Sequence, residues 1–289
     1  MRNRFSGSMI TVALAAAAVS AVISISITRT SGQATRPARV GGKPNFSGIW
    51  QANNEAYWDL EARLQSLGFD FTYDKRLLEF LVERRPAELW RHLLGRGTAF
   101  VSRCAHFLEN HDEPRIASRL SLDEHRAAAL LILALPGMRL LHDGQLDGAR
   151  VRVPVHLGRR PREAPVPAIA ALYRQLLALL PTTAIGRGTP RLIETFPVAA
   201  TDEGSQNVIL IEWLMQNGAS DLVVVNLSSQ PARAVIPLPG NQTGTNAWRV
   251  RDLAAPPGAA PCELAIEQNA LTLHLRPYAA LLLHSNSGG

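Results

Sequence analysis

Between residues 60 and 180 the sequence alternates short apolar segments with stretches of helical periodicity. Strand, helix and strand in succession form the repeating unit of a parallel sheet, so this alternation predicts an α/β fold. The expected helices cover 56–67, 77–94 with a break at Pro86, 121–135 with Ser121 and Glu124 as a capping box, and 167–180. The expected strands are 69–71, 105–108 and 138–142. Polar residues gather where these strands end, and in a (β/α)8 barrel that edge carries the catalytic residues.

From about residue 192 the pattern changes to apolar segments separated by Gly, Pro, Asn and Ser turns, without helical periodicity. Such a series predicts an antiparallel β-sandwich, which we place at 190–286. The strand candidates are 192–198, 208–214, 222–227, 232–238, 264–267, 271–275 and 279–284.

The N-terminus has the features of an export signal. Arg2 and Arg4 precede an apolar run over 9–27, and we expect residues 1–34 to be a signal peptide. The run is nearly long enough to span a bilayer, so an uncleaved anchor is the alternative, and this segment is the only expected membrane contact. The protein is then periplasmic or extracellular if the leader is genuine, and otherwise cytoplasmic. Residues 35–54, rich in Pro, Arg and Gly, are expected to be a linker.

Charge and cysteine content exclude some functions. The formal net charge is +6, and the only lysines are Lys43 and Lys75. The arginines are scattered rather than clustered in a basic stripe, so we expect no nucleic-acid partner. Cys104 and Cys262 lie far apart and in no metal-binding spacing, so no metal and no cofactor are expected. Buried thiols are the expected state, and pairing in an exported protein stays open.

Residues 106–115 read HFLENHDEPR. This segment resembles the fourth conserved region of the α-amylase family of glycoside hydrolases, in which an apolar strand ends in Asn-His-Asp. The resemblance implies that Asp112 is a catalytic carboxylate that holds two sugar hydroxyls and a distorted ring. It also implies substrate-binding roles for Asn110, His111 and Arg115. The alternative is a loop whose Asn and Asp satisfy only the backbone of a turn.

Further segments resemble the same family. Residues 136–145 are similar to its eighth barrel strand, 67–76 to its sixth, and 55–58 to its third conserved region, in which Glu55 would be the catalytic acid/base. The alternative for Glu55 is an exposed carboxylate at a helix start. The resemblance implies a partial (β/α)8 barrel over 55–185, roughly from strand five or six to strand eight, followed by the β-sandwich.

Part of the family pattern is absent from these 289 residues. The Gly-aromatic-Arg-x-Asp segment that carries the family's nucleophile is missing, so we expect no glycosidase turnover by this chain alone. The expected partners are an α-glucan or maltooligosaccharide and a polypeptide that supplies the missing N-terminal half-barrel. Whether the ancestral enzyme hydrolysed, transferred or isomerised its substrate stays open.

The leader adds a second resemblance. Residues 43–50 are similar to the opening of unrelated exported bacterial proteins, which suggests a fusion near Asn54. The alternative function for the whole chain is an exported, non-enzymatic module that binds carbohydrate or has a structural role.

Overall fold

The computed structural model describes residues 39–40, 43–44, 60–154, 159, 161–194, 204–237, 248–252, 264–267 and 270–285. Internal contacts divide the chain into two units, 1–56 and 57–289. In the first unit, β1 (Arg39–Val40) pairs with β2 (Lys43–Pro44) in antiparallel register. The expected export signal, the proposed junction at Asn54 and the candidate acid/base Glu55 lie outside the described residues.

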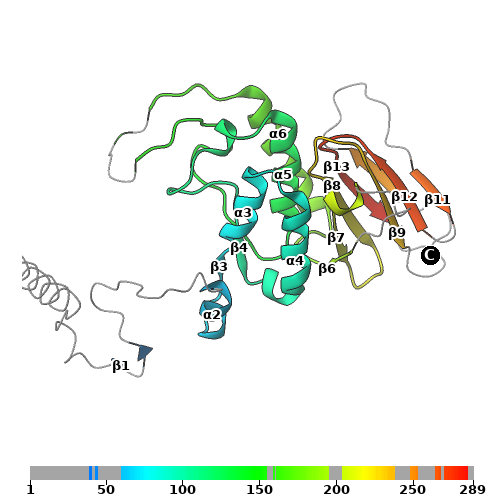
Figure 1. Ribbon diagram of the computed structural model, residues 1–289, viewed down its shortest axis with the longest axis horizontal. Coiled ribbons are helices and arrows are strands. Elements are labelled where there is room, and N and C mark those ends of the chain that lie inside the picture. The colour runs from blue at the N-terminus through cyan, green and yellow to red at the C-terminus, as the bar shows by residue number, and fades with distance from the viewer. Residues whose placement is uncertain are drawn as a thin grey trace, which may run out of the picture. The chain divides into compact units, whose positions relative to one another are not determined.

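The second unit begins with a small parallel sheet and its helices (Figure 1). Its strands are β3 (Thr72–Tyr73), β4 (Cys104–His106) and β5 (Met138–Arg139), in the order β3-β4-β5. The helices are α2 (Leu60–Ser66), α3 (Lys75–Val82), α4 (Pro86–Val101), α5 (Leu122–Ala134) and α6 (Pro167–Leu179). Short 3-10 turns cover Ile116–Ser118 and Leu180–Thr182. The predicted alternation of strands and helices in an α/β fold is therefore confirmed.

One predicted strand is misplaced. We expected 69–71, but β3 lies at Thr72–Tyr73, where it pairs with Cys104 and Ala105 of β4. Phe69 and Phe71 are 46% and 43% exposed. Their alternation imitates a half-buried strand, whereas the real position is fixed by pairing with β4.

Local sequence signals set the helix boundaries. At the start of α5, the Ser121 hydroxyl accepts from the Glu124 amide at 3.3 Å, and the Glu124 carboxylate accepts from the Ser121 amide at 2.8 Å, so the predicted capping box is present. Pro86 stands in the first turn of α4, where it needs no amide hydrogen, and separates that helix from α3 as predicted.

Gly137 allows the turn that follows α5 to pack closely against the backbone at the start of β4. Its φ is +116°, and a Cβ at this position would lie 2.5 Å from the Cys104 carbonyl oxygen. Only glycine fits there, because the conformation is left-handed and the space is taken by backbone. The preceding Pro136 carbonyl oxygen lies 2.9 Å from Nε2 of the buried His106. The Pro-Gly pair therefore fixes where β5 begins.

The rest of the second unit consists of two antiparallel sheets. The five-stranded sheet has the order β10-β13-β8-β7-β6, and the three-stranded sheet has the order β11-β12-β9. The strands are β6 (Thr189–Leu192), β7 (Val208–Leu214), β8 (Ser220–Asn226), β9 (Ala232–Pro237), β10 (Trp248–Asp252), β11 (Leu264–Glu267), β12 (Ala270–Leu275) and β13 (Ala280–Ser285), with a 3-10 turn at Ser205–Asn207. Most agree with the expected strands within two residues. The first, 192–198, overlaps β6 only at Leu192, and its residues 195–198 lie outside the described ranges.

The strands β7, β8 and β13 of the five-stranded sheet contribute apolar residues to both faces. Residues alternate between the two faces of a strand, so Ile209 and Ile211 of β7 join the core formed with the helices. Val208 and Leu210 join a second core shared with β9 and β12. Burial on both faces explains why β7 reads as an apolar run interrupted only by Glu212. In Figure 1, α4 and α5 lie beside this sheet. None of the helices in the described ranges combines the length and the hydrophobicity needed to cross a bilayer.

A buried hydrogen bond joins the helical layer to the five-stranded sheet. Trp213 is 4% exposed, and its Nε1 donates to the carbonyl oxygen of Ala134 at the end of α5, at 2.8 Å. This carbonyl belongs to the last helical turn and has no intrahelical amide to accept from.

We predict that Trp213→Phe lowers the free energy of unfolding by about 1–2 kcal/mol more than Trp90→Phe does, measured by urea denaturation. Trp90 is a matched control because it is 3% exposed and its indole nitrogen has no hydrogen-bond partner among the described residues. Both substitutions remove the same volume, so the difference reports the hydrogen bond. Equal effects of the two substitutions would contradict the prediction.

Candidate functional site

The loops that follow β4 and β5 leave the parallel sheet at the same edge. Ala105 and His106 of β4 pair with Met138 and Arg139 of β5 in parallel register. The carboxyl ends of parallel neighbours point the same way, so residues 107–115 and 140–150 start side by side. Four of the five predicted site residues lie in the first of these loops.

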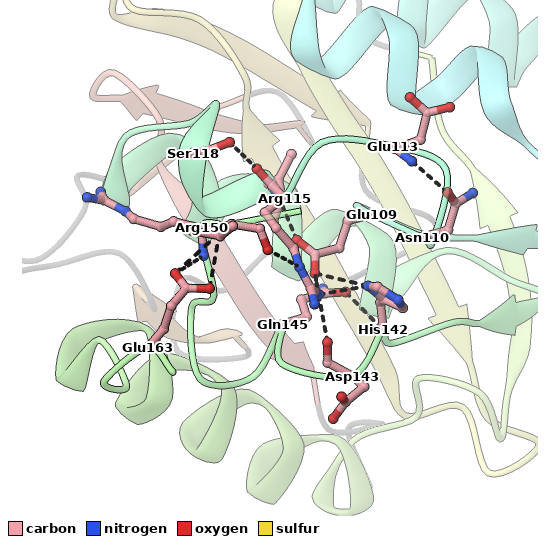
Figure 2. A network of polar contacts seen from close by, with 12 residues as sticks. Glu109, Asn110, Glu113, Arg115, Ser118, His142, Asp143, Gln145, Arg150 and Glu163 are labelled. Atoms are coloured by element: carbon pink, nitrogen blue, oxygen red, sulfur yellow. Dashed lines mark hydrogen bonds and ion pairs between the residues drawn. The ribbon is translucent and has the colours of Figure 1, made fainter. Parts of the chain in front are cut away.

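Asn110 forms the turn of this loop. Its side-chain Oδ1 accepts hydrogen bonds from the backbone amides of Asp112 and Glu113, at 2.8 and 3.0 Å, and the residue is 7% exposed (Figure 2). This is the local bonding by which Asn stabilises turns. Its described contacts therefore correspond to the turn-forming alternative, and a sugar contact by Asn110 stays a prediction.

His111 and Asp112 point outward from the same turn. Their side chains are 55% and 65% exposed, and Nε2 of His111 lies 3.2 Å from Oδ2 of Asp112. An imidazole beside a carboxylate offers a donor and an acceptor to the hydroxyl groups of a ligand. The turn thus leaves both side chains accessible, as their predicted roles require.

Arg115 lies inside the protein. Its Nη1 is 2.6 Å from Oε1 of Glu109, and the two side chains are 5% and 0% exposed. Nη1 also lies 2.6 Å from the carbonyl oxygen of Asp143 in the loop after β5, and Nε donates to the Val151 carbonyl at 3.4 Å. Arg115 therefore joins the two loops, and the contacts of its guanidinium in the structure are to protein groups.

The ion pair continues into a chain of buried polar groups (Figure 2). Nδ1 of His142 lies 2.8 Å from Nη1 of Arg115, and the backbone amide of His142 donates to Gln145 at 3.2 Å. Gln145 in turn donates to the Tyr173 hydroxyl at 2.7 Å, and Nε2 of His125 lies 2.9 Å from that hydroxyl. Segments after β4 and β5 are thereby linked to α5 and α6.

The sequence alone indicated no site role for Glu109, His142, Gln145 or Tyr173. One signal was available, since Glu109 directly follows the apolar run 105–108 that was predicted as a strand, and Arg115 comes six residues later. A charge next to an apolar strand needs a partner when it is buried.

A cavity of about 210 Å³ adjoins the same loop. Leu78, Val82 and Leu108 contribute apolar surface, whereas Lys75 and Glu113 form an ion pair of 3.0 Å at its wall. The hydrogen bond to Glu113 raises the pKa of Lys75. Concave surface with a few polar groups is typical of ligand sites.

Within the described ranges, no group of three or more His, Cys, Asp or Glu side chains is arranged to hold a metal ion. Cys104 is a free, buried thiol whose pKa is raised to about 12 by burial. Cys262 lies outside the described residues.

In sequence, the chain matches no protein-family profile and no curated protein. In three dimensions it is similar to solved α-amylases. The α-amylase from H. orenii shares 20% identity with a TM-score of 0.56, over 79% of this chain and 52% of that chain. A maltogenic α-amylase from Thermotoga neapolitana shares 18% identity with a TM-score of 0.58, over 79% and 54%. The α-amylase from Geobacillus thermoleovorans, solved with acarbose, shares 14% identity with a TM-score of 0.55, over 78% and 51%.

At these identities the likeness concerns the fold, and function has to be argued from the site. The chain has an α-amylase-like α/β fold over about four-fifths of its length. It spans about half the length of the solved structures that it matches.

We predict that Arg115→Met lowers the free energy of unfolding by about 3–5 kcal/mol, because it leaves the buried Glu109 carboxylate without its cation. Arg76→Met is the control: Arg76 pairs with Glu79 at 3.1 Å, but the two side chains are 60% and 38% exposed. Loss of such a surface pair changes stability by about 0.5 kcal/mol or less. Chemical denaturation compares the two variants, and an Arg115→Met effect as small as that of Arg76→Met would contradict the buried pairing.

A second prediction concerns pH. Burial lowers the pKa of His125 to about 4, whereas in the unfolded chain a histidine titrates near 6.5. Between these values the unfolded state binds the additional proton, so the free energy of unfolding decreases as the pH falls through this window. From pH 7 to pH 5 the expected loss from His125 is about 2 kcal/mol. Denaturation at both pH values should show a smaller loss in His125→Gln than in the wild type, and an unchanged loss would contradict the assignment.

Proposed function

We propose that this chain is the C-terminal half of an α-glucan-acting glycoside hydrolase or transglycosylase fold, and that it binds α-glucan through His111 and Asp112. In this proposal β3, β4 and β5 are strands six to eight of a (β/α)8 barrel, and the two antiparallel sheets are its C-terminal β-sandwich. The fold likeness to α-amylases supports the assignment, because the matched region runs through both parts of the second unit.

One observation carries the proposal. In the turn after β4, the buried side chain of Asn110 accepts hydrogen bonds from the backbone of the turn itself. Asp112, whose side chain is 65% exposed, lies beside His111 at the edge of the sheet from which the loops of the parallel strands leave. A carboxylate here can accept from two hydroxyls of one sugar, which is the binding mode expected of a glycosidase carboxylate that is not the nucleophile. The Geobacillus thermoleovorans α-amylase was solved with acarbose, so an oligosaccharide of this kind is the natural probe.

We further propose that the chain has no glycosidase turnover on its own. A retaining mechanism needs a nucleophile as well as an acid/base, and no Gly-aromatic-Arg-x-Asp segment occurs in the sequence. The nucleophile would come from a second polypeptide that supplies the N-terminal half-barrel. Residues 1–34 would serve export to the periplasm or the exterior, and Glu55 would be the acid/base if it reaches the same edge.

The alternative, a non-enzymatic carbohydrate-binding module formed by the sheets, has less support. Aromatic platforms for sugar stacking must be accessible, yet Trp213 is 4% exposed and is held by its hydrogen bond to α5. The side chain of Trp248 lies outside the described residues.

We predict that the full chain binds maltoheptaose and acarbose in isothermal titration calorimetry, and that Asp112→Asn weakens binding about tenfold, because hydrogen bonds to a charged group contribute about 1.5–3 kcal/mol. Asp70→Asn is the matched control, since Asp70 is also exposed but precedes β3 at the opposite edge of the sheet. Incubation with maltoheptaose should release no reducing sugar.

The outcomes separate the parts of the proposal. Absence of binding by the wild type would refute the α-glucan site. Equal binding by Asp112→Asn and Asp70→Asn would refute the role of Asp112. Sugar release that disappears in Asp112→Asn would refute the claim of inactivity.

A further inference from the structure

The buried polar network behind the candidate site reaches solvent at one of its members, His142. Arg115 is 4% exposed, Gln145 and Tyr173 are each 1% exposed, and Glu109 and His125 are fully buried. The His142 side chain is 27% exposed. Figure 2 shows His142 next to Glu109, Arg115 and Gln145. His142 is therefore the place where this network can touch a ligand.

The surroundings of His142 select one tautomer. Nη1 of Arg115 lies 2.8 Å from Nδ1, and a guanidinium carries only donors. Nη1 has two hydrogens for three acceptors, namely Oε1 of Glu109, the Asp143 carbonyl oxygen and Nδ1, so one hydrogen is shared. Nδ1 faces this donor group, accepts from it and carries no hydrogen. The nearest carboxylate oxygen, Oε1 of Glu109, is 3.5 Å from Nδ1, much farther than the Arg115 donor at 2.8 Å, so the donor decides which nitrogen carries the hydrogen. In the neutral ring the hydrogen then resides on Nε2, which becomes a donor of fixed identity.

The position of the ring is fixed as well. The backbone amide of His142 donates to Oε1 of Gln145, and the Gln145 side chain is anchored on the Tyr173 hydroxyl. His142 follows β5, the parallel neighbour of β4, and the loop after β4 carries Asp112. Both side chains therefore emerge from the same edge of the sheet.

We propose that His142 is a further ligand-contacting residue, whose Nε2–H donates to an oxygen of the bound α-glucan, and that Glu109 and Arg115 are the residues that position it. This inference rests on the α-glucan site proposed above and adds a contact from the neighbouring loop. A purely structural role for His142 would use Nδ1 alone, as an acceptor for Arg115, and would place no requirement on Nε2.

The binding test compares two substitutions of His142 by calorimetry with maltoheptaose on the full chain. His142→Phe keeps the ring shape but has no donor, and we expect its Kd to rise about three- to tenfold, the value of one neutral hydrogen bond. His142→Gln places an amide donor near the former Nε2 and should bind within about twofold of the wild type. His274→Phe, an exposed histidine of β12, is the control for loss of a histidine elsewhere.

Stability separates a ligand contact from a structural role. Both His142 variants lose the acceptor for Arg115, so we expect thermal unfolding to shift by a similar amount in the two, while only His142→Phe loses affinity. The His142 contact is refuted if His142→Phe and His142→Gln lose affinity equally, or if neither loses affinity. The Asp112 site stands in both cases as long as Asp112→Asn still weakens binding. If the wild type does not bind maltoheptaose, both proposals fall.

The tautomer gives a test that needs no ligand. NMR spectra of the ¹⁵N-labelled full chain, recorded at a pH where the ring is neutral, report which imidazole nitrogen carries the hydrogen. The signals of His142 are identified as those that are absent from the spectrum of His142→Gln. We expect the hydrogen on Nε2 and an unprotonated Nδ1. A hydrogen on Nδ1 would overturn the inference whatever the binding data show.

Discussion

The buried ion pair between Glu109 and Arg115 is the interaction on which the geometry of the candidate site depends. Glu109 ends the run that begins with β4 and is fully buried, so its charge must be compensated within the protein. Arg115 supplies that charge and also reaches Asp143 and Val151 in the segment after β5. The second carboxylate oxygen accepts from the Ile116 amide at 2.6 Å and so places the 3-10 turn that follows. The Glu109–Arg115 pair thus fixes how the loop after β4 turns back, and it connects this loop to the loop after β5.

The scaffold beneath these loops includes the antiparallel sheets. Ten of the thirteen residues of α5 are buried, because the helix packs against β8 and β13 of the five-stranded sheet and against α6. Ile209, Ile211 and Trp213 of β7 belong to the same core as the helices. A sheet whose outer face is this apolar would expose it to water if it were separated from α5. The sheets therefore support the site, and this role argues against treating them as an autonomous module.

The sequence predicted those features that depend on near neighbours along the chain. The Ser121–Glu124 capping box and the break at Pro86 are short-range, and both occur where expected. Strands buried on both faces, such as β7, were recognised from continuous apolar runs. By contrast, β3 is only two residues long and its place is set by pairing with β4, so the alternation of Phe69 and Phe71 was misleading. The resemblance implied that Arg115 contacts substrate, and the sequence alone did not reveal that its guanidinium is buried against Glu109.

The polar residues of the HFLENHDEPR segment divide by direction, and this division has a physical meaning. Glu109, Asn110 and Arg115 face inward and are satisfied by protein groups, whereas His111 and Asp112 face solvent. A buried ion pair contributes little net stability compared with apolar residues of similar volume, because desolvation offsets most of the Coulomb attraction. We therefore infer that Glu109, Asn110 and Arg115 serve mainly to fix the conformation of the turn. The turn holds the exposed side chains of His111 and Asp112, and Arg115 holds His142 of the next loop, in defined positions.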